Sequence, residues 1–307
     1  MLPSAIRIAR ACLFGALLGL AAAAPTRAEP VRLDFEGRQL NGNLQLAGGA
    51  GIGQGVMLLV HGTLAHNRLE IMRDLQALLG ERGISTLAVT LSLGLPDRSG
   101  MYDCALPHRH GNAQAVAEIA AWVGWAQRQG AAKIGLLGHS RGGAQVALYA
   151  ARGGDALPAA VQRIVLAAPT TFDAARAPAD YRARFGGDFD AVLKQAQAMA
   201  AAGRGGELMQ QTDFMYCPKT SVAADTFLDY HSGDGRNDAP SQLAAIRRPV
   251  LVVLAGGDEV VRDLPQKLAA ARKPAGLKVV TVDAADHFFQ ELFGEDLADA
   301  VAAFWQE

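Results

Sequence analysis

Short, unbroken apolar runs alternate along most of the chain with longer stretches in which apolar residues recur every three or four positions. The short runs are typical of strands buried on both faces, and the longer stretches are typical of helices with one buried side. An α/β fold with a mostly parallel sheet covered by helices on both faces is therefore expected. The predicted strands span 56–60, 84–91, 134–137, 161–168, 249–255 and 277–282, and the predicted helices span 71–82, 113–128, 264–272 and 297–305.

Two regions depart from this alternation. The runs 31–35 and 43–46 predict a short antiparallel hairpin, with Glu36-Gly37 and Asn41-Gly42 in its connection. The segment at about 169–246 carries alanine- and glutamine-rich helical patterns and no obvious strand. Because it is inserted between two sheet strands, we expect it to form a helical cap over the functional site rather than a domain of its own.

The first 28 residues have the features of a secretory signal peptide. Arg7 and Arg10 form a positive start, an apolar stretch follows at 11–24, and small residues offer cleavage sites at Thr26 and Ala28 or at Ala22 and Ala24. An uncleaved membrane anchor is the alternative, but the apolar run is shorter than the roughly 20 residues that cross a bilayer. We therefore expect a mature protein of residues 29–307 that is exported, periplasmic or extracellular, and without a stable membrane anchor.

Composition narrows the classes of partner. The chain has 307 residues, half of them apolar, and a net charge of −1. Loss of residues 1–28 would remove three arginines and no acid, which takes the net charge to −4. A chain this close to neutral, with no basic cluster, is not expected to bind nucleic acid.

Cysteine usage is consistent with export. Cys12 would leave with the signal peptide, so Cys104 and Cys217 are the cysteines of the mature chain. Both lie in polar, turn-rich stretches, and an oxidising compartment favours their pairing. A Cys104–Cys217 disulfide is therefore predicted.

The segment 133–146 carries the main chemical signal. The apolar run 134–137 leads into Gly138-His139-Ser140-Arg141-Gly142, and an alanine-rich helical pattern follows at once. Gly-x-Ser-x-Gly between a strand and a helix is a nucleophile elbow, a strained turn that projects the serine hydroxyl away from the sheet. Glycine occupies positions 138 and 142, and we expect that a Cβ at either position would collide with the neighbouring strand or helix.

A serine hydroxyl needs a base, and the base needs a carboxylate that orients it. Asp258 follows the strand 249–255, and His287 follows the strand 277–282. In this architecture the nucleophile, acid and histidine occur in that chain order, each after a strand. The other acids that could take the role of Asp258 are Glu259, Asp263 and Asp283.

These motifs resemble the α/β-hydrolase fold superfamily, and the resemblance covers all of the mature chain except the cap. It implies Ser140 as nucleophile, His287 as general base and then general acid, and Asp258 as the carboxylate that holds the imidazole. It also implies an oxyanion hole built from the backbone N–H of Arg141 and that of Thr63, which follows His61-Gly62, with Leu64 as the fallback for Thr63. No cofactor and no metal is implied.

The remaining polar residues near these motifs have simpler interpretations. His61 and His139 are interpreted as structural, and Arg141 as a solvated side chain at a helix start, although contact with a substrate carboxylate is an alternative. His108 and His110, with His66 and Cys104 nearby, have a spacing at which two histidines can share a metal, but no framework with zinc-finger or HExxH spacing accompanies them, so metal binding is not expected. Because the loops 63–68 and 92–111 each follow a strand, we expect Tyr102, Arg109 and His110 to face the substrate.

The function expected is that of an exported serine hydrolase that cleaves a small-molecule carboxylic ester or related acyl compound through an acyl-enzyme. The serine argues against the dehalogenase branch of the superfamily, and the modest cap favours a small or medium acyl group. The alanine-rich stretch 191–202 is a poor lipid-facing surface, which argues against an interfacial lipase. A peptidase or amidase with the same triad and a noncatalytic exported binding protein of the same fold are the alternatives.

Overall fold

The computed structural model describes residues 28–307. The predicted signal peptide, apart from Ala28, and Cys12 therefore lie outside the described residues. Within the described part of the chain, no helix has the length and hydropathy needed to cross a membrane.

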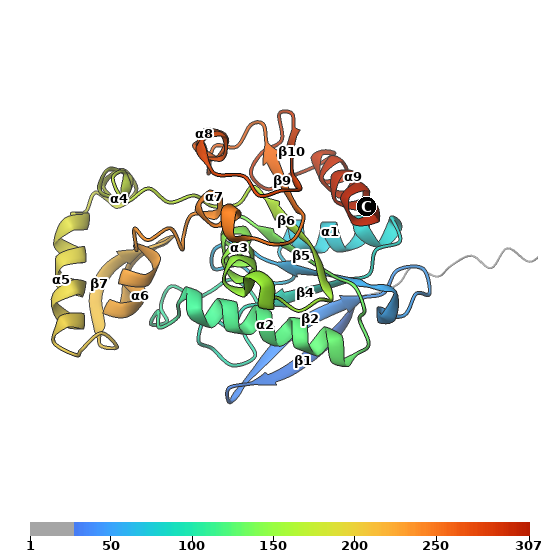
Figure 1. The fold of residues 1–307 in the computed structure, drawn as a ribbon. Coiled ribbons are helices and arrows are strands. Elements are labelled where there is room, and N and C mark those ends of the chain that lie inside the picture. Colours follow the sequence, from blue (N-terminus) through green and yellow to red (C-terminus); the bar gives the residue numbers. More distant parts are fainter. Residues whose placement is uncertain (1–27) are drawn as a thin grey trace, which may run out of the picture.

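The centre of the molecule is an eight-stranded sheet with the order β1-β2-β4-β3-β5-β6-β9-β10 (Figure 1). The six strands from β4 to β10 are parallel to one another, and β1 and β2 form an antiparallel hairpin at the edge beside β4. The predicted α/β fold with a mostly parallel sheet is confirmed. The strands are β1 (Glu29–Phe35), β2 (Arg38–Gln45), β3 (Val56–Val60), β4 (Thr86–Thr90), β5 (Ile134–His139), β6 (Val161–Ala167), β9 (Val250–Ala255) and β10 (Leu277–Val282).

The connection of the hairpin is shorter than predicted. Glu36 and Gly37, with φ values of 49° and 72°, form the two-residue turn whose twist suits a hairpin. Asn41 and Gly42, expected in the connection, lie inside β2 instead. A Cβ at Gly42 would stand 3.2 Å from the carbonyl oxygen of Ala88 on β4, so the glycine is there for close packing of the strands rather than for a turn.

Helices cover both faces of the sheet. Alternate residues of β3 belong to different hydrophobic clusters, as expected for a strand whose side chains point to opposite faces. Leu58 packs with Trp122 of α2 on one face, and Leu59 packs with Leu75 of α1 on the other. The helices around the sheet are α1 (Glu70–Glu81), α2 (Asn112–Arg128), α3 (Arg141–Gly153), α7 (Ala239–Gln242), α8 (Leu264–Ala270) and α9 (Phe293–Gln306).

The insertion between β6 and β9 stands to one side of the sheet, at the left of Figure 1. It contains an antiparallel hairpin, so the expectation of a purely helical cap is wrong. Most exposed positions of its two strands carry polar residues. These strands therefore lack the unbroken apolar run from which the other strands were predicted. The elements of the cap are α4 (Ala177–Phe185), α5 (Phe189–Ala201), β7 (Leu208–Phe214), β8 (Cys217–Ala223) and α6 (Ala224–Tyr230).

The cap has a hydrophobic cluster of its own, separate from those on the two faces of the sheet. Aromatic side chains from its helices and from β7 form the centre of this cluster. Phe214 and Phe227, both fully buried, have ring centroids 6.1 Å apart. The cap is therefore held together mainly by contacts among its own residues.

Covalent and backbone contacts attach the cap to the loop after β4. Cys104 of that loop forms a disulfide with Cys217 of β8, with their Cα atoms 5.3 Å apart. The backbone of His108 continues the connection, because its N–H donates to Ser221 at 2.8 Å and its carbonyl accepts from Ala223 at 2.9 Å. The loop between β4 and α2 thus pairs with the edge of the cap hairpin.

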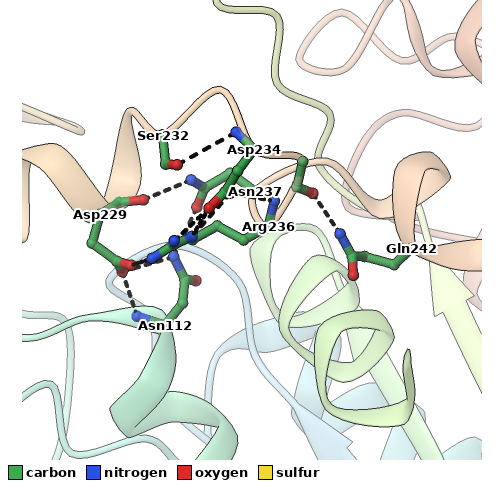
Figure 2. A network of polar contacts seen from close by, with 8 residues as sticks. Asn112, Asp229, Ser232, Asp234, Arg236, Asn237 and Gln242 are labelled. Atoms are coloured by element: carbon green, nitrogen blue, oxygen red, sulfur yellow. Dashed lines mark hydrogen bonds and ion pairs between the residues drawn. The ribbon is translucent and has the colours of Figure 1, made fainter. Parts of the chain in front are cut away.

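A polar network forms the second attachment and is drawn in Figure 2. Asp229 of α6 accepts hydrogen bonds from the backbone N–H of Asn112 at 2.6 Å and from its side chain at 2.9 Å. The same carboxylate pairs with Arg236 at 2.7 Å. Asn112 is the first residue of α2, so a carboxylate of the cap satisfies an N-terminal N–H of a core helix, where negative charge is favoured.

Candidate active site

Ser140 lies at the turn between β5 and α3 with a φ of 54° and a ψ of −123°, a strained conformation for a residue other than glycine. The flanking glycines are required by close contacts. A Cβ at Gly138 would stand 2.3 Å from the carbonyl oxygen of Gly142, and one at Gly142 would stand 2.4 Å from the carbonyl oxygens of Val60 and His61. The collisions expected from the sequence are thus with the start of α3 and the end of β3.

The side chains of Ser140, His287 and Asp258 form a chain of hydrogen bonds. His287 Nε2 lies 2.9 Å from Ser140 Oγ, and His287 Nδ1 lies 2.8 Å from Asp258 Oδ2. Asp258 follows β9 and His287 follows β10, and these parallel neighbours bring both loops to the edge of the sheet where β5 also ends. The sequence therefore named three residues that the fold brings together.

Asp258 is held as a carboxylate by several donors. Burial raises its pKa, but the hydrogen bond from His287 and those from the N–H groups of Val261 and Val260 outweigh burial, so the pKa is lowered overall. None of the three rival acids has a hydrogen bond to His287 within residues 28–307. Glu259 pairs with Arg262, Asp263 accepts from Thr171 at 2.6 Å, and Asp283 is exposed.

His139 and His61 have structural contacts, as expected. His139 Nε2 lies 2.8 Å from the carbonyl oxygen of His287, and burial lowers the His139 pKa to about 3, so a neutral ring donates to the backbone of the neighbouring loop. His61 Nε2 accepts from the N–H of Leu91 at 3.0 Å, and burial and Arg98 lower the His61 pKa to about 3. Both rings tie adjacent loops together at the end of the sheet.

The loop after β3 lies directly against the nucleophile. A Cβ at Gly62 would stand 3.2 Å from the Cβ of Ser140, and Arg141 Nε donates to Thr63 Oγ1 at 3.1 Å. The backbone N–H groups of Thr63 and Arg141 make no hydrogen bond to a backbone carbonyl within residues 28–307. The N–H group of the alternative, Leu64, has no such bond in this part of the chain either, so the donors expected for an oxyanion hole, on Arg141 and on Thr63 or Leu64, are not occupied by backbone carbonyls.

A cleft with a volume of about 630 Å³ lies between residues of the cap and the segment 259–263, and Ser140 itself is not among its lining residues. Its lining includes Arg141, which follows Ser140, and Val260, which lies two residues after Asp258. Arg141 is partly buried, its guanidinium carbon lies 5.1 Å from the centre of the Tyr230 ring, and burial lowers its pKa. Arg141 is therefore not a freely exposed side chain, because Tyr230 of α6 lies against its guanidinium, but it faces the cleft.

The three residues expected to face the substrate do not line this cleft. Tyr102 is buried and donates to the carbonyl of Pro107 at 3.0 Å, and exposed Arg109 donates to the carbonyl of Gly206 in the cap. His110 is buried between His108 and Tyr230, with contacts of 3.0 Å to each. The expectation failed because the cap hairpin packs on this loop.

Within residues 28–307, no cluster of three or more metal-binding side chains is present.

Tyr230 is the residue that sequence reasoning missed. It is the last residue of α6 and belongs both to the cap cluster and to the lining of the cleft. Its hydroxyl is hydrogen-bonded to His110. Burial raises its pKa strongly, so the phenol stays neutral. The only local signal was an apolar pair, Phe227 and Leu228, one turn earlier, which is equally typical of a purely structural helix.

Sheet order, the strained serine turn and the hydrogen-bonded side chains at the ends of three strands define the class as an α/β hydrolase. A model of the Alpha/beta hydrolase family matches residues 57–304, so the chain belongs to this family. The superfamily expected from the motifs is thereby confirmed. No curated protein sequence matches the chain.

Several solved structures share this fold. Est1E from Butyrivibrio proteoclasticus is 20% identical and aligns over 90% of this chain and 97% of its own, with a TM-score of 0.63. A monoacylglycerol lipase from Paleococcus ferrophilus is 17% identical over 87% and 98%, with a TM-score of 0.58. A thioesterase domain from the curacin biosynthetic pathway is 17% identical over 92% and 100%, with a TM-score of 0.53.

Proposed function

We propose that this protein is an exported serine hydrolase that cleaves a carboxylic ester or related acyl compound through an acyl-enzyme. The observation that carries the proposal is the hydrogen-bonded chain from Ser140 Oγ through His287 to Asp258. Similar structures that are named as a lipase and a thioesterase support acyl chemistry as the reaction type.

In the first half of the reaction, Asp258 accepts the Nδ1–H of His287, which leaves Nε2 unprotonated and facing Ser140. Nε2 takes the hydroxyl proton as the oxygen attacks the carbonyl carbon. The C=O double bond becomes a C–O⁻ single bond, and the N–H groups of Arg141 and Thr63 stabilise this oxyanion. When the intermediate collapses, the imidazolium gives its proton to the leaving alcohol and the acyl group remains on Ser140.

In the second half, a water molecule takes the place of the alcohol. His287 removes a proton from this water, the hydroxide adds to the acyl carbon, and the same two N–H groups hold the second oxyanion. Collapse releases the carboxylic acid, and Ser140 recovers its proton from His287. His139 contributes by fixing the backbone of His287, so it is a positioning residue in this scheme.

Export is part of the proposal and is supported by two observations. Residues 1–28 have the composition of a signal peptide, and a disulfide joins Cys104 to Cys217. Fractionation of cells that express the full chain, followed by mass determination of the product, tests it. We expect a product that starts near residue 29 in the exported fraction; a full-length chain in the cytoplasm would contradict export.

The test of the activity is hydrolysis of a chain-length series of p-nitrophenyl esters by residues 29–307, beside Ser140→Ala. We expect turnover that favours short or medium acyl groups and falls to background in Ser140→Ala. Folding of the variant is checked by circular dichroism and thermal unfolding. Equal turnover by the wild type and a folded Ser140→Ala variant would contradict the proposal, and preference for aminoacyl amides over all esters would redirect it to an amidase.

A further inference from the structure

The side chain of Arg141 is the unusual group of the cleft. Its backbone follows the nucleophile, and its guanidinium lies inside the cleft against the ring of Tyr230. A guanidinium has five N–H donors. Within residues 28–307, Nε donates to Thr63 Oγ1, whereas the Nη groups make no hydrogen bond to protein and no carboxylate oxygen lies within 4.0 Å.

The other charged residues that line the cleft do not share this property. Arg176 pairs with Asp180 and Asp263, and Arg262 pairs with Glu259. Asp173 accepts from the N–H of Ala175. Arg184 also lacks a carboxylate partner, but it is exposed and donates to the carbonyl of Met215. Apart from Arg141, the lining has three arginines and four acids, so the cleft as a whole carries no excess positive charge. Arg141 is distinguished instead by Nη groups that make no hydrogen bond to protein within residues 28–307.

We propose that Arg141 binds a carboxylate on the substrate, so that the substrate class is an ester that also carries a free carboxylate group. This inference rests on the proposed ester hydrolysis. The Nη groups of a guanidinium form a flat pair of donors that matches the two oxygens of a carboxylate. The aromatic face of Tyr230 and the bond to Thr63 hold the guanidinium in place, so little side-chain freedom is lost when the anion binds.

The position of Arg141 links recognition to chemistry. Its main-chain N–H belongs to the proposed oxyanion hole, and its side chain reaches the cleft from the same residue. A substrate carboxylate held by the side chain therefore fixes the ester carbonyl relative to Ser140. A neutral ester of the same shape lacks this anchor and leaves the Nη donors without an anion, so it is expected to react more slowly.

The first test compares matched substrates. For the acyl side, the pair is mono-p-nitrophenyl glutarate and p-nitrophenyl 5-methylhexanoate, in which an isopropyl group replaces the carboxylate. For the alcohol side, the pair is 4-butyryloxybenzoate and 4-tolyl butyrate. We expect wild-type kcat/KM to favour the anionic member of at least one pair by roughly 10- to 100-fold, the range for hydrogen bonds to a charged group.

Variants then assign this preference to one side chain. In Arg141→Gln the ratio of kcat/KM between the two members should fall to near one, and Arg141→Lys should restore part of it. Arg262→Gln is the matched control, because it removes one positive charge at the rim, where Arg262 is already paired with Glu259. The inference is overturned if neither pair shows an anionic preference, or if Arg141→Gln keeps the ratio of the wild type.

A binding measurement separates this inference from the proposed function. Titration calorimetry with monoethyl glutarate uses the Ser140→Ala protein and the Ser140→Ala/Arg141→Gln double variant. We expect binding that weakens roughly 10- to 100-fold when Arg141 is replaced. Binding with this dependence in a protein whose wild type hydrolyses no ester would keep the carboxylate subsite and overturn the function. Ester hydrolysis together with equal binding by both variants would keep the function and overturn the subsite.

Discussion

The serine turn and the cap meet at the same cleft but are stabilised by different kinds of contact. The turn at Ser140 depends on local backbone packing, in which Gly138 and Gly142 allow β5, α3 and β3 to approach within contact distance. The cap, at about 169–246, depends on its own aromatic cluster and on attachments to residues far away in the chain. In the proposed reaction the turn supplies the nucleophile, and residues of the cap line part of the cleft beside it.

This difference leads to different expectations for mutations. Changes at the turn, or at His287 and Asp258 that are hydrogen-bonded to it, should remove chemistry and leave most of the stability, since one polar side chain is exchanged. Changes at the cap attachments should reduce stability or substrate binding and leave the chemical step nearly intact. The following four predictions test this separation, in order of decreasing effect.

Loss of the orienting carboxylate should have the largest effect. Asp258→Asn replaces the carboxylate that accepts the Nδ1–H of His287 with a neutral amide. The imidazole is then no longer held in the form whose Nε2 is unprotonated. We expect kcat on p-nitrophenyl esters to fall roughly 10³- to 10⁴-fold. Asp283→Asn, which removes an exposed carboxylate from the loop of His287, is the control and should stay within about twofold of the wild type. Equal losses in the two variants would show a general effect of charge.

Removal of the disulfide should weaken the cap rather than the chemistry. The bond links residues with a separation of 113 in the sequence. Closure of a loop of this size is worth about 3–5 kcal/mol in the chain-entropy treatment, so Cys104→Ser/Cys217→Ser should lower the free energy of unfolding by that amount. Urea denaturation measures it, and kcat for a short ester should change by less than about threefold. A tenfold loss of kcat in the folded double variant would contradict the separation.

Acid should destabilise both regions through neutral histidines, of which His139 is buried and His231 half-buried. Burial lowers the pKa of His139 near the turn to about 3 and that of His231 in the cap to about 4, from 6.5. Between 6.5 and these values the unfolded chain binds more protons than the folded one. The stability that neutral histidine contributes is thus complete above pH 6.5 and decreases as the pH falls toward the folded-state pKa.

Each such histidine steepens the fall by up to about 1.4 kcal/mol per pH unit. His231→Phe keeps an aromatic ring against Phe227, whose ring centroid lies 4.2 Å from that of His231, and removes one titrating group. The slope of the unfolding free energy between pH 6.5 and 4.5 should therefore be smaller in His231→Phe. An unchanged slope would show that the pKa of His231 is not lowered in the folded protein.

The polar attachment in Figure 2 should give the smallest effect. Asp229→Asn removes the charge that pairs with Arg236 and accepts from Asn112. We expect a loss of about 1–2 kcal/mol in unfolding free energy and a rise in KM that exceeds the change in kcat. Asp234→Asn is the matched control, because its exposed carboxylate pairs with the same arginine and should contribute under about 0.5 kcal/mol. Equal losses of unfolding free energy in Asp229→Asn and Asp234→Asn would show that only the pairing with Arg236 matters.

The sequence was most informative where function depends on local motifs. Ser140, Asp258 and His287 each follow an apolar strand, and parallel strands bring their ends to one edge, so both the sheet and the three side chains were predictable. The cap hairpin was not, because β7 and β8 are polar and are stabilised by packing on residues distant in sequence. The predicted environments of Arg141 and Tyr102 differ from the observed ones for the same reason, since cap residues determine how far these side chains are buried.

Labelling of residues 29–307 with a fluorophosphonate, followed by intact-mass and peptide mass spectrometry, tests most directly whether Ser140 is an activated nucleophile. We expect one adduct per chain on the peptide that contains Ser140, formed more slowly in Asp258→Asn and absent in Ser140→Ala. Adducts on another serine, or a folded wild-type protein that does not react, would contradict the proposal that the Ser140–His287–Asp258 chain performs covalent catalysis.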